Sequence, residues 1–358
     1  QPGIGQVRAL ITVATNPVLS SPDGDRLSKA LETLDFMVSL DIYVNETTRH
    51  ADVILPGLSP LEDMHFDVAF PQLSWRNHAR YSAPVLPPPP GHPAEWESLL
   101  KLDAIANGQT TSSDAITLDD AQFALDADRL FGAAAGSVIQ ATRGLHGPER
   151  AIEVALRTGP YGDQFGRNPD GLTLAKVKQA TANGGVDLGE LQPRLPEMLR
   201  TPSGKVELAP EILLQDLKRA AQDLRRLPPD LVIIGRRDVR TNNSWMHNLP
   251  TLAKGPYRCT ALVHPVDAAR HGVDQGGMAV LRNGHRSIEV QIHISDEMMP
   301  GVVSLPHGWG HDRPGARMSV AAERPGVNLN ALLDDQLRDP LSGNAVLGGV
   351  PITMHAAL

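Results

Sequence analysis

The sequence has a single cysteine, Cys259, among 358 residues. One cysteine excludes an intrachain disulfide, and it excludes zinc or iron–sulfur sites built from several cysteines of this chain. Chains without disulfides are typical of the cytoplasm, so we predict a cytoplasmic protein. Cys259 begins the run Cys259-Thr-Ala-Leu-Val263, which is typical of a strand, and we expect a buried, unreactive thiol there.

The chain also lacks an excess of basic charge and any long apolar run. Its net charge of -8 excludes a broad nucleic-acid surface, which would need many basic residues. No apolar run approaches the roughly 18 residues that a membrane span requires. The start, Gln1-Pro-Gly-Ile-Gly5, has neither the basic nor the apolar region of a signal peptide. Because it has no initiator methionine, we expect a fragment or a processed chain.

Residues 1–108 alternate short apolar runs with helical patterns. Val7–Ala14 is predicted to be a buried strand, and it ends at the turn signal Asn16-Pro17. Phe36–Leu40 and Val53–Leu55 are predicted to be further strands. Strands that alternate with helices pair in parallel. We therefore predict a Rossmann-like α/β domain with a doubly wound parallel sheet.

Residues 109–228 are rich in glycine, proline, aspartate and alanine. Helices are expected near Leu118–Phe131 and Glu211–Leu227, with loops between them. A long irregular segment in a compact fold usually covers something or connects domains. We predict a helical, loop-rich connecting region that ends at Pro228-Pro229.

Residues 229–358 have the pattern of a β domain. Met278–Arg282 and Ser287–Ser295 are predicted to form a hairpin, with its turn at Asn283-Gly284. The second strand alternates apolar and polar residues, so one of its faces should be buried. The remaining expected strands are Leu231–Ile234, Cys259–Val263, Val302–Leu305 and Val350–Met354. Many short strands in a small domain predict a closed barrel.

Asp41 follows a predicted parallel strand at its carboxyl end, which is the edge where open α/β sheets bind ligands. A carboxylate at this edge accepts hydrogen bonds from two adjacent donors, and guanine offers such a pair in its ring N–H and amino group. Asn16 follows the preceding strand at the same edge. The alternative is that Asp41 is only a turn or N-cap residue.

A loop dense in hydrogen-bond donors follows the strand at Leu231–Ile234. Its arginines can neutralise phosphates, and its polar side chains and free backbone N–H groups add donors. Trp245 or His247 is suited to packing on a planar ring. The alternative is a polar, positively charged loop whose tryptophan is anchored in the core. The candidate binding residues here are Gly235, Arg236, Arg237, Thr241, Asn242, Asn243 and Ser244.

His307 and His311 follow another predicted strand with a spacing that occurs in metal sites. That spacing brings two histidines together on a helix, and the glycines between them disfavour a helix, so we predict no metal site. A tight loop that brings His307 near a ligand is the favoured interpretation. No catalytic residue can be named from the sequence.

Several linked motifs resemble the dimethyl-sulfoxide-reductase superfamily of molybdopterin oxidoreductases. This resemblance covers roughly two-thirds of the chain and implies a double-psi β-barrel for residues 229–358. The motifs in the N-terminal block are Asn16-Pro17, Leu34–Val38 leading to Asp41, Glu46-Thr47, Ala51–Pro56 and Glu62. Those in the C-terminal block are Gly235-Arg236 with the loop to His247, His264-Pro265 with Asp267-Ala268, Gly301 with Pro306, and Asn328-Leu329.

The resemblance implies a bis(molybdopterin guanine dinucleotide) cofactor with molybdenum or tungsten. Asp41 would bind a guanine, and Asn16 would line the same site. The loop from Gly235 to Ser244 would bind the pyrophosphate and pterin of the other dinucleotide, with His307 and Asn328 as further contacts. The family carries its metal ligand and any iron–sulfur cluster upstream, so the partners implied are an N-terminal half of the same protein and an electron-transfer subunit.

The resemblance implies two-electron redox of a small substrate, as in formate dehydrogenases and nitrate or S/N-oxide reductases. Three other functions stay open. One is a non-redox hydratase of the same family. The others are a stand-alone cofactor-binding module without catalysis and an interaction scaffold that has lost the cofactor.

Overall fold

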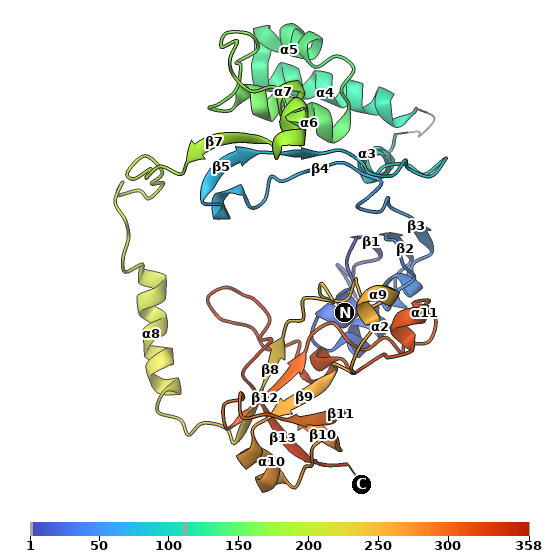
Figure 1. Cartoon of the computed structure of the whole chain (residues 1–358), viewed down its shortest axis with the longest axis vertical. Coiled ribbons are helices and arrows are strands. Elements are labelled where there is room, and N and C mark those ends of the chain that lie inside the picture. The colour runs from blue at the N-terminus through green and yellow to red at the C-terminus, as the bar shows by residue number, and fades with distance from the viewer. Residues whose placement is uncertain (1–2, 110–112, 358) are drawn as a thin grey trace. The chain divides into compact units, whose positions relative to one another are not determined.

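The computed structural model describes residues 3–109 and 113–357 (Figure 1). The chain forms two compact units, one of residues 1–54 with 205–358 and the other of residues 55–204. These units divide the chain at points other than the predicted domain boundaries at 108 and 228, so those boundaries stay a prediction. Each unit is described by itself below.

A small parallel sheet opens the first unit. Its strands β1 (Ala9–Val13), β2 (Phe36–Leu40) and β3 (Val53–Leu55) lie in that order, and β1 pairs with β2 in parallel. The chain between β1 and β2 forms the helices α1 (Pro17–Ser20) and α2 (Gly24–Leu31). The side chain of Asp23 accepts a hydrogen bond from the first turn of α2 and so caps the helix. The predicted parallel pairing is therefore confirmed.

Helices α1 and α2 cover one face of this sheet. Val18, Leu31 and Met37 form the core on that side. On the other face Ile11 is 50% exposed and Phe36 is 48% exposed. The prediction of a buried strand at Val7–Ala14 is wrong, because β1 is an edge strand with helices on one side only. The doubly wound arrangement stays a prediction.

The C-terminal part of the first unit contains a closed six-stranded barrel. Its strands follow the order β10-β11-β9-β12-β8-β13 around the barrel. The predicted closed barrel is confirmed, and the double-psi connectivity stays a prediction. The strands are β8 (Leu231–Arg236), β9 (Thr260–Val263), β10 (Met278–Asn283), β11 (Arg286–Ile294), β12 (Val302–Pro306) and β13 (Val350–Ala356).

Alternating side chains fill the barrel. Ile233, Leu281 and Ile292 are almost fully buried, and each such side chain stabilises the fold by about 1.5–3 kcal/mol. The hairpin of β10 and β11 is confirmed, but its turn is one residue later than predicted. Asn283 still pairs with Arg286, so Gly284 occupies the first turn position, where its φ of +58° suits glycine.

Cys259 lies in the core beside β9 and is fully buried, as predicted. Burial raises the pKa of its thiol to about 11. Because the thiolate is the reactive form, the thiol is unreactive at neutral pH.

Short helices surround the barrel. His264 caps the first of them, and Gly272 ends that helix with a φ of +62°. These elements are α10 (Pro265–His271), α9 (Pro250–Ala253), α11 (Ser319–Ala322) and the 3-10 helix η5 (Leu329–Leu332). The unit also includes α8 (Glu211–Asp223), which confirms the helix predicted at Glu211–Leu227.

The second unit, residues 55–204, combines helices with two small antiparallel sheets. Its helices are α3 (Glu95–Ala106), α4 (Ala115–Phe131), α5 (Ala135–Ala141), α6 (Gly147–Thr158) and α7 (Leu174–Ala180). Its sheets pair β4 (His65–Phe66) with β6 (Tyr81–Ser82) and β5 (Arg76–Ala79) with β7 (Val186–Glu190).

The loops predicted between Phe131 and Glu211 are in part wrong, because α5, α6, α7 and β7 lie there. Val177 and Leu174 of α7 are almost fully buried and form a core with Tyr81. This packing supplies stability that the local sequence pattern did not indicate. Within residues 3–109 and 113–357, no helix has both the length and the apolar character that a bilayer span needs.

Candidate functional site

The candidate site is a cavity of about 300 Å³ in the first unit. It lies where the loop after β1 meets the loops that follow β8 and β12. Five of the residues singled out in the sequence line it: Asn16, Arg237, Asn243, Ser244 and His307. The other lining residues are Ala14, Thr15, Leu19, Ser20, Trp245, Gly308 and Leu347.

Strand pairing explains why two of these loops meet. β8 and β12 are parallel neighbours, and Pro306 pairs with Arg236 at their carboxyl ends. The next residues, Arg237 and His307, therefore leave the barrel at the same edge. The backbone N–H of His307 donates to the Arg236 carbonyl at 2.9 Å, which holds the two loops together.

Gly308 allows the two loops to touch. A Cβ at this position would lie 2.0 Å from the Asn243 carbonyl oxygen, and the φ of Gly308 is +91°. Asn242 and Asn243 also have positive φ, of 40° and 62°. Asparagine adopts this conformation more readily than most residues, so the sequence Thr-Asn-Asn-Ser suits the sharp turn of the loop.

The cavity is suited to an anion. Arg237 supplies a permanent positive charge, and its guanidinium donates to the Asn243 side-chain oxygen. The pKa of His307 is lowered, first by burial and then by the charge of Arg237, so this histidine is neutral at neutral pH. Ser244, which is buried, adds a hydroxyl donor.

Asn16 is held in place by two neighbours. Its side-chain nitrogen donates to Glu46 Oε2 at 2.7 Å, and its side-chain oxygen accepts from the Thr47 hydroxyl at 2.7 Å. The Thr47 hydroxyl in turn accepts from the backbone N–H of Val18 at 3.0 Å. Because that backbone group can only donate, the orientation of the Asn16 amide is fixed.

Glu46 continues into a buried network that the sequence did not predict. His311 Nδ1 lies 2.9 Å from Glu46 Oε1, and both side chains are 0% exposed. His311 Nε2 lies 2.5 Å from His247 Nδ1. Glu46 and Asn16 belong to the sheet, whereas both histidines follow barrel strands, so the network joins the two parts of this unit.

The charges in this network are set by contact. Burial raises the pKa of Glu46, but the hydrogen bond and charge of His311 and the hydrogen bond from Asn16 outweigh burial and leave that pKa lowered. Burial and the charge of His311 lower the pKa of His247 to about 3. Glu46 is therefore ionised and His247 neutral at neutral pH.

Asp41 does follow β2 at its carboxyl end. One carboxylate oxygen accepts from the Tyr43 backbone N–H at 3.1 Å and the other from the Asn45 amide at 3.0 Å. Burial raises its pKa. Asp41 is not among the residues that line the cavity, and its role toward guanine stays a prediction.

The guanidinium of Arg236 contacts the barrel. It donates to the carbonyl oxygens of Ser304 and Thr260 at 3.0 and 3.1 Å, and burial lowers its pKa. Gly235 lies in β8, and Asn242 is exposed on the loop. None of these three lines the cavity, and their cofactor roles stay predictions.

Asn328 and Thr241 are both buried. Asn328 Nδ2 has no hydrogen-bond partner among the described residues, which leaves a buried donor ready for a ligand. A Cβ on Gly310 would lie 2.9 Å from Asn328 Cβ, so a glycine is needed beside it. Thr241 lines a second, smaller cavity.

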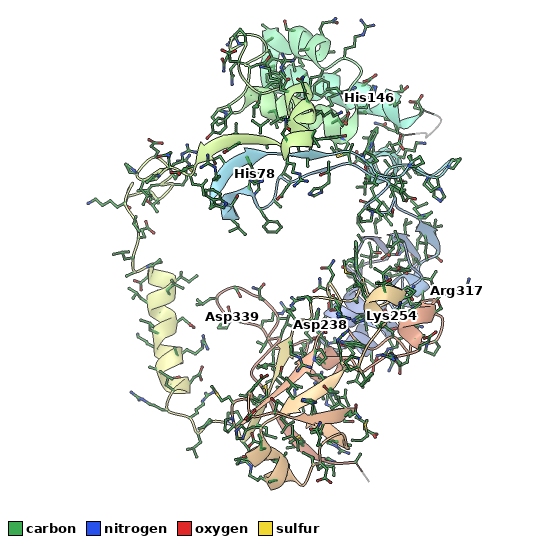
Figure 2. The ribbon with its side chains drawn as sticks, in the orientation of Figure 1. His78, His146, Asp238, Lys254, Arg317 and Asp339 are labelled. Atoms are coloured by element: carbon green, nitrogen blue, oxygen red, sulfur yellow. The ribbon has the colours of Figure 1, made fainter. Side chains whose placement is uncertain are left out.

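The loop that joins these features begins near Asp238, which is labelled in Figure 2. The Asp238 carboxylate accepts from the Arg240 backbone N–H at 2.9 Å, and its carbonyl accepts from the Thr241 hydroxyl at 3.1 Å. These bonds give the loop a fixed shape.

A cluster of Asp119, Asp120 and His146 in the second unit has the geometry of metal ligands. His146 is labelled in Figure 2. Arg150 already forms ion pairs with both aspartates, so its charge satisfies the cluster. His307 and His311 are not part of any such cluster in the described chain.

Two family models match the sequence. Residues 1–91 match the molybdopterin oxidoreductase model, and residues 231–351 match the molydopterin dinucleotide binding domain model.

Curated relatives match over most of the chain. The probable oxidoreductase YoaE of Bacillus subtilis is 24% identical over 353 residues, which are 96% of this chain and 43% of that protein. A putative dimethyl sulfoxide reductase of Halobacterium salinarum, in its catalytic chain, is 26% identical over 311 residues, which are 80% of this chain and 31% of that protein. The chain thus spans less than half the length of these relatives.

A solved structure shares the fold. Acetylene hydratase from Pelobacter acetylenicus superposes with a TM-score of 0.64 at 18% sequence identity. The match covers 98% of this chain and 44% of that protein.

Proposed function

Because this chain belongs to the molybdopterin oxidoreductase family, we propose that its larger cavity holds part of a molybdopterin guanine dinucleotide. The observation that carries the proposal is the convergence of three distant segments on one space. Asn16, the loop of Arg237 to Ser244, and His307 line a cavity of about 300 Å³, which is within the usual range for ligand sites.

The donor set fits the charge of this cofactor. A pyrophosphate group needs positive charge and several N–H or O–H donors, and Arg237, Asn243 and Ser244 supply them. The unpartnered Nδ2 of Asn328 is a further donor nearby in sequence to the cavity loops. Asp41, with a carboxylate at the strand edge, is proposed to bind guanine.

The residues of this chain bind and orient, and the cofactor carries the reaction. When bound, it supplies two-electron redox chemistry at molybdenum or tungsten. Arg237 fixes the negative end, and neutral His307 offers one donor and one acceptor nitrogen. Glu46 and Thr47 hold the Asn16 amide in one orientation, so that its face toward the cavity is preset.

We propose that the whole protein is a bis(molybdopterin guanine dinucleotide) oxidoreductase acting on a small substrate, as in formate dehydrogenases and S/N-oxide reductases. Its metal ligand, any iron–sulfur cluster and an electron-transfer subunit would lie outside this chain. The exposed sheet face with Ile11 and Phe36 is suited to the remaining part of the same protein. Burying those side chains there would stabilise the association.

Replacing Arg237 with alanine tests the cavity. A lost charge-assisted hydrogen bond should weaken retention of the dinucleotide about ten- to a hundredfold. The measurement is the guanosine nucleotide that stays with purified protein after extended dialysis. Arg282→Ala, which removes an exposed arginine of β10, is the matched control and should retain it fully. Equal retention in both variants would contradict the proposed role of the cavity.

A further inference from the structure

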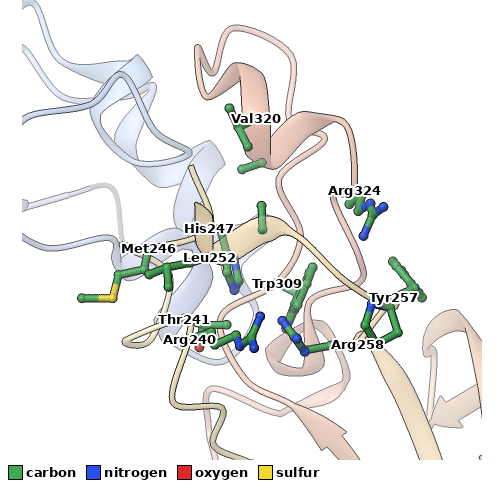
Figure 3. A pocket seen from close by; sticks show the side chains of 13 residues that line it. Arg240, Thr241, Met246, His247, Leu252, Tyr257, Arg258, Trp309, Val320 and Arg324 are labelled. Atoms are coloured by element: carbon green, nitrogen blue, oxygen red, sulfur yellow. The ribbon is translucent and has the colours of Figure 1, made fainter. Parts of the chain in front are cut away.

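A second cavity lies on the other side of the same loop. Arg237, Asn243 and Ser244 line the larger cavity, whereas Arg240 and His247 line the smaller one. Figure 3 shows this smaller cavity, with His247 and Trp309 beside Arg240 and Arg258. Arg324 lines it as well. The larger cavity is the proposed cofactor site, so the smaller one is a separate feature.

Two buried nitrogens at this cavity have no partner. His247 is 6% exposed and Trp309 is 9% exposed. Neither His247 Nε2 nor Trp309 Nε1 has a hydrogen-bond partner among the described residues. The two rings pack together with their centroids 4.3 Å apart. Buried polar groups without partners are rare and costly, which points to a missing ligand.

The chemistry of these groups calls for an acceptor. The indole nitrogen of Trp309 can only donate a hydrogen bond. Arg240, Arg258 and Arg324 are permanent cations that only donate. Arg240 and Arg324 each spend one N–H on a carbonyl oxygen, of Lys254 and Gly255 respectively, and keep others free. A ligand that satisfies this set must be rich in acceptor atoms and negatively charged.

The buried network decides what His247 presents. The ionised carboxylate of Glu46 requires a proton on His311 Nδ1. A buried carboxylate without a countercharge is unfavourable, which favours a second proton on His311. His311 Nε2–H then donates to His247 Nδ1, and the one proton of neutral His247 sits on Nε2. The low pKa of His247, about 3, agrees with a neutral ring beside a charged one.

We propose that Glu46, His311 and His247 form a proton relay, and that His247 Nε2–H, Trp309 Nε1–H and the arginines Arg240, Arg258 and Arg324 bind a small oxyanion of the phosphate or sulfate type. The space open to the centres of water-sized molecules is about 30 Å³, so one oxygen reaches the two buried nitrogens. The other oxygens remain at the mouth, among the arginines. The ligand is either a free oxyanion or the phosphate of a nucleotide.

The relay makes this binding depend on pH. Beyond its relay partners, His247 faces Asp238 and His307 through space and Arg240, Tyr257, Arg258 and Arg324 around the cavity. When the relay loses its shared proton, His247 Nδ1–H donates back to His311 Nε2. His247 Nε2 then presents a lone pair, which repels an oxyanion. Affinity should therefore fall on the alkaline side, by up to about tenfold per pH unit for one linked proton.

The test is calorimetric titration of the intact protein with sulfate, whose charge is constant around neutral pH. Wild-type protein should bind sulfate saturably. His247→Phe keeps a ring against Trp309 and removes the donor, and Arg324→Gln removes an exposed cation; each should weaken binding about tenfold or more. Arg282→Gln is the matched control. Competition with guanosine monophosphate distinguishes the sources, because tighter binding of the nucleotide assigns the ligand as a nucleotide phosphate.

A Glu46→Gln variant tests the relay at a distance from the ligand. The fixed amide of Asn16 directs the glutamine oxygen toward itself, so the glutamine nitrogen donates to His311 Nδ1. The relay then runs in the same direction without a charge. Sulfate should still bind, but its pH dependence should be absent.

Nitrogen-15 spectra of the imidazole rings should show a proton on His247 Nε2 in wild-type protein. Three results would overturn the proposal: no saturable sulfate binding, unchanged affinity in His247→Phe, or the same pH dependence in wild type and Glu46→Gln. Loss of cofactor retention in Arg237→Ala leaves sulfate binding intact, so failure of this proposal and failure of the cofactor proposal are distinguishable.

Discussion

Replacing Gly308 with alanine is expected to disrupt the candidate site and lower the free energy of unfolding of the first unit by about 2–5 kcal/mol. The new Cβ would lie 2.0 Å from the Asn243 carbonyl oxygen and 2.6 Å from its carbonyl carbon. Both are backbone atoms, so the two loops must separate. The positive φ of +91° adds backbone strain.

Gly276→Ala is the matched control for this prediction. Gly276 lies in the same unit and has a φ of +76°, but nothing lies within 4 Å of the position of its Cβ. It should lose only the cost of the positive φ, about 1–2 kcal/mol. Denaturant unfolding followed by circular dichroism measures both variants. If Gly308→Ala is no less stable than the control, the loops do not touch as described.

Replacing Glu46 with alanine is expected to lower the free energy of unfolding by about 3–5 kcal/mol at neutral pH. The substitution leaves the His311 imidazole and the Asn16 amide buried without their shared partner. Glu289→Ala, which removes an exposed carboxylate of β11, should change stability by less than about 0.5 kcal/mol.

The cost of Glu46→Ala should depend on pH. The folded state lowers the pKa of Glu46 below its ordinary value of 4.5, so its ionised form stabilises the fold above that value. This contribution is lost as the pH falls through the lowered pKa. The stability difference between wild type and variant should be full near pH 7 and shrink in acid. A difference that does not change down to acid denaturation would contradict the ion pair.

The barrel was predictable from the sequence because its strands carry local signals. Ile288, Val290 and Ile292 alternate with polar residues, and Gly284 marks the turn. These patterns depend only on neighbours along the chain. By contrast, the exposure of Ile11 depends on whether a second layer covers the sheet, and an apolar run does not reveal that.

The buried network was beyond the sequence for a similar reason. Glu46 and His311 are 265 positions apart, and the two residues meet only because the sheet packs beside the barrel. His307 and His311 attracted attention through their spacing, but the structure separates their surroundings. His307 lines the larger cavity, whereas His311 bonds with Glu46 and His247.

Arg236 and Arg237 show the limit of predicting a binding loop from its composition. The two arginines are adjacent, yet only Arg237 lines the cavity, while Arg236 binds carbonyl oxygens of the barrel. Alternation along β8 turns successive side chains to opposite sides. Composition predicted an anion site at this loop, and the strand geometry determines which arginine is available to it.

The most direct test of the account is the release of cofactor from the intact protein, produced in a host that makes the molybdenum cofactor. After acid denaturation, the account predicts fluorescent pterin together with guanosine monophosphate, both absent from the Arg237→Ala protein that has been dialysed. Intact wild-type protein that releases neither compound would contradict the assignment of the larger cavity to a molybdopterin guanine dinucleotide.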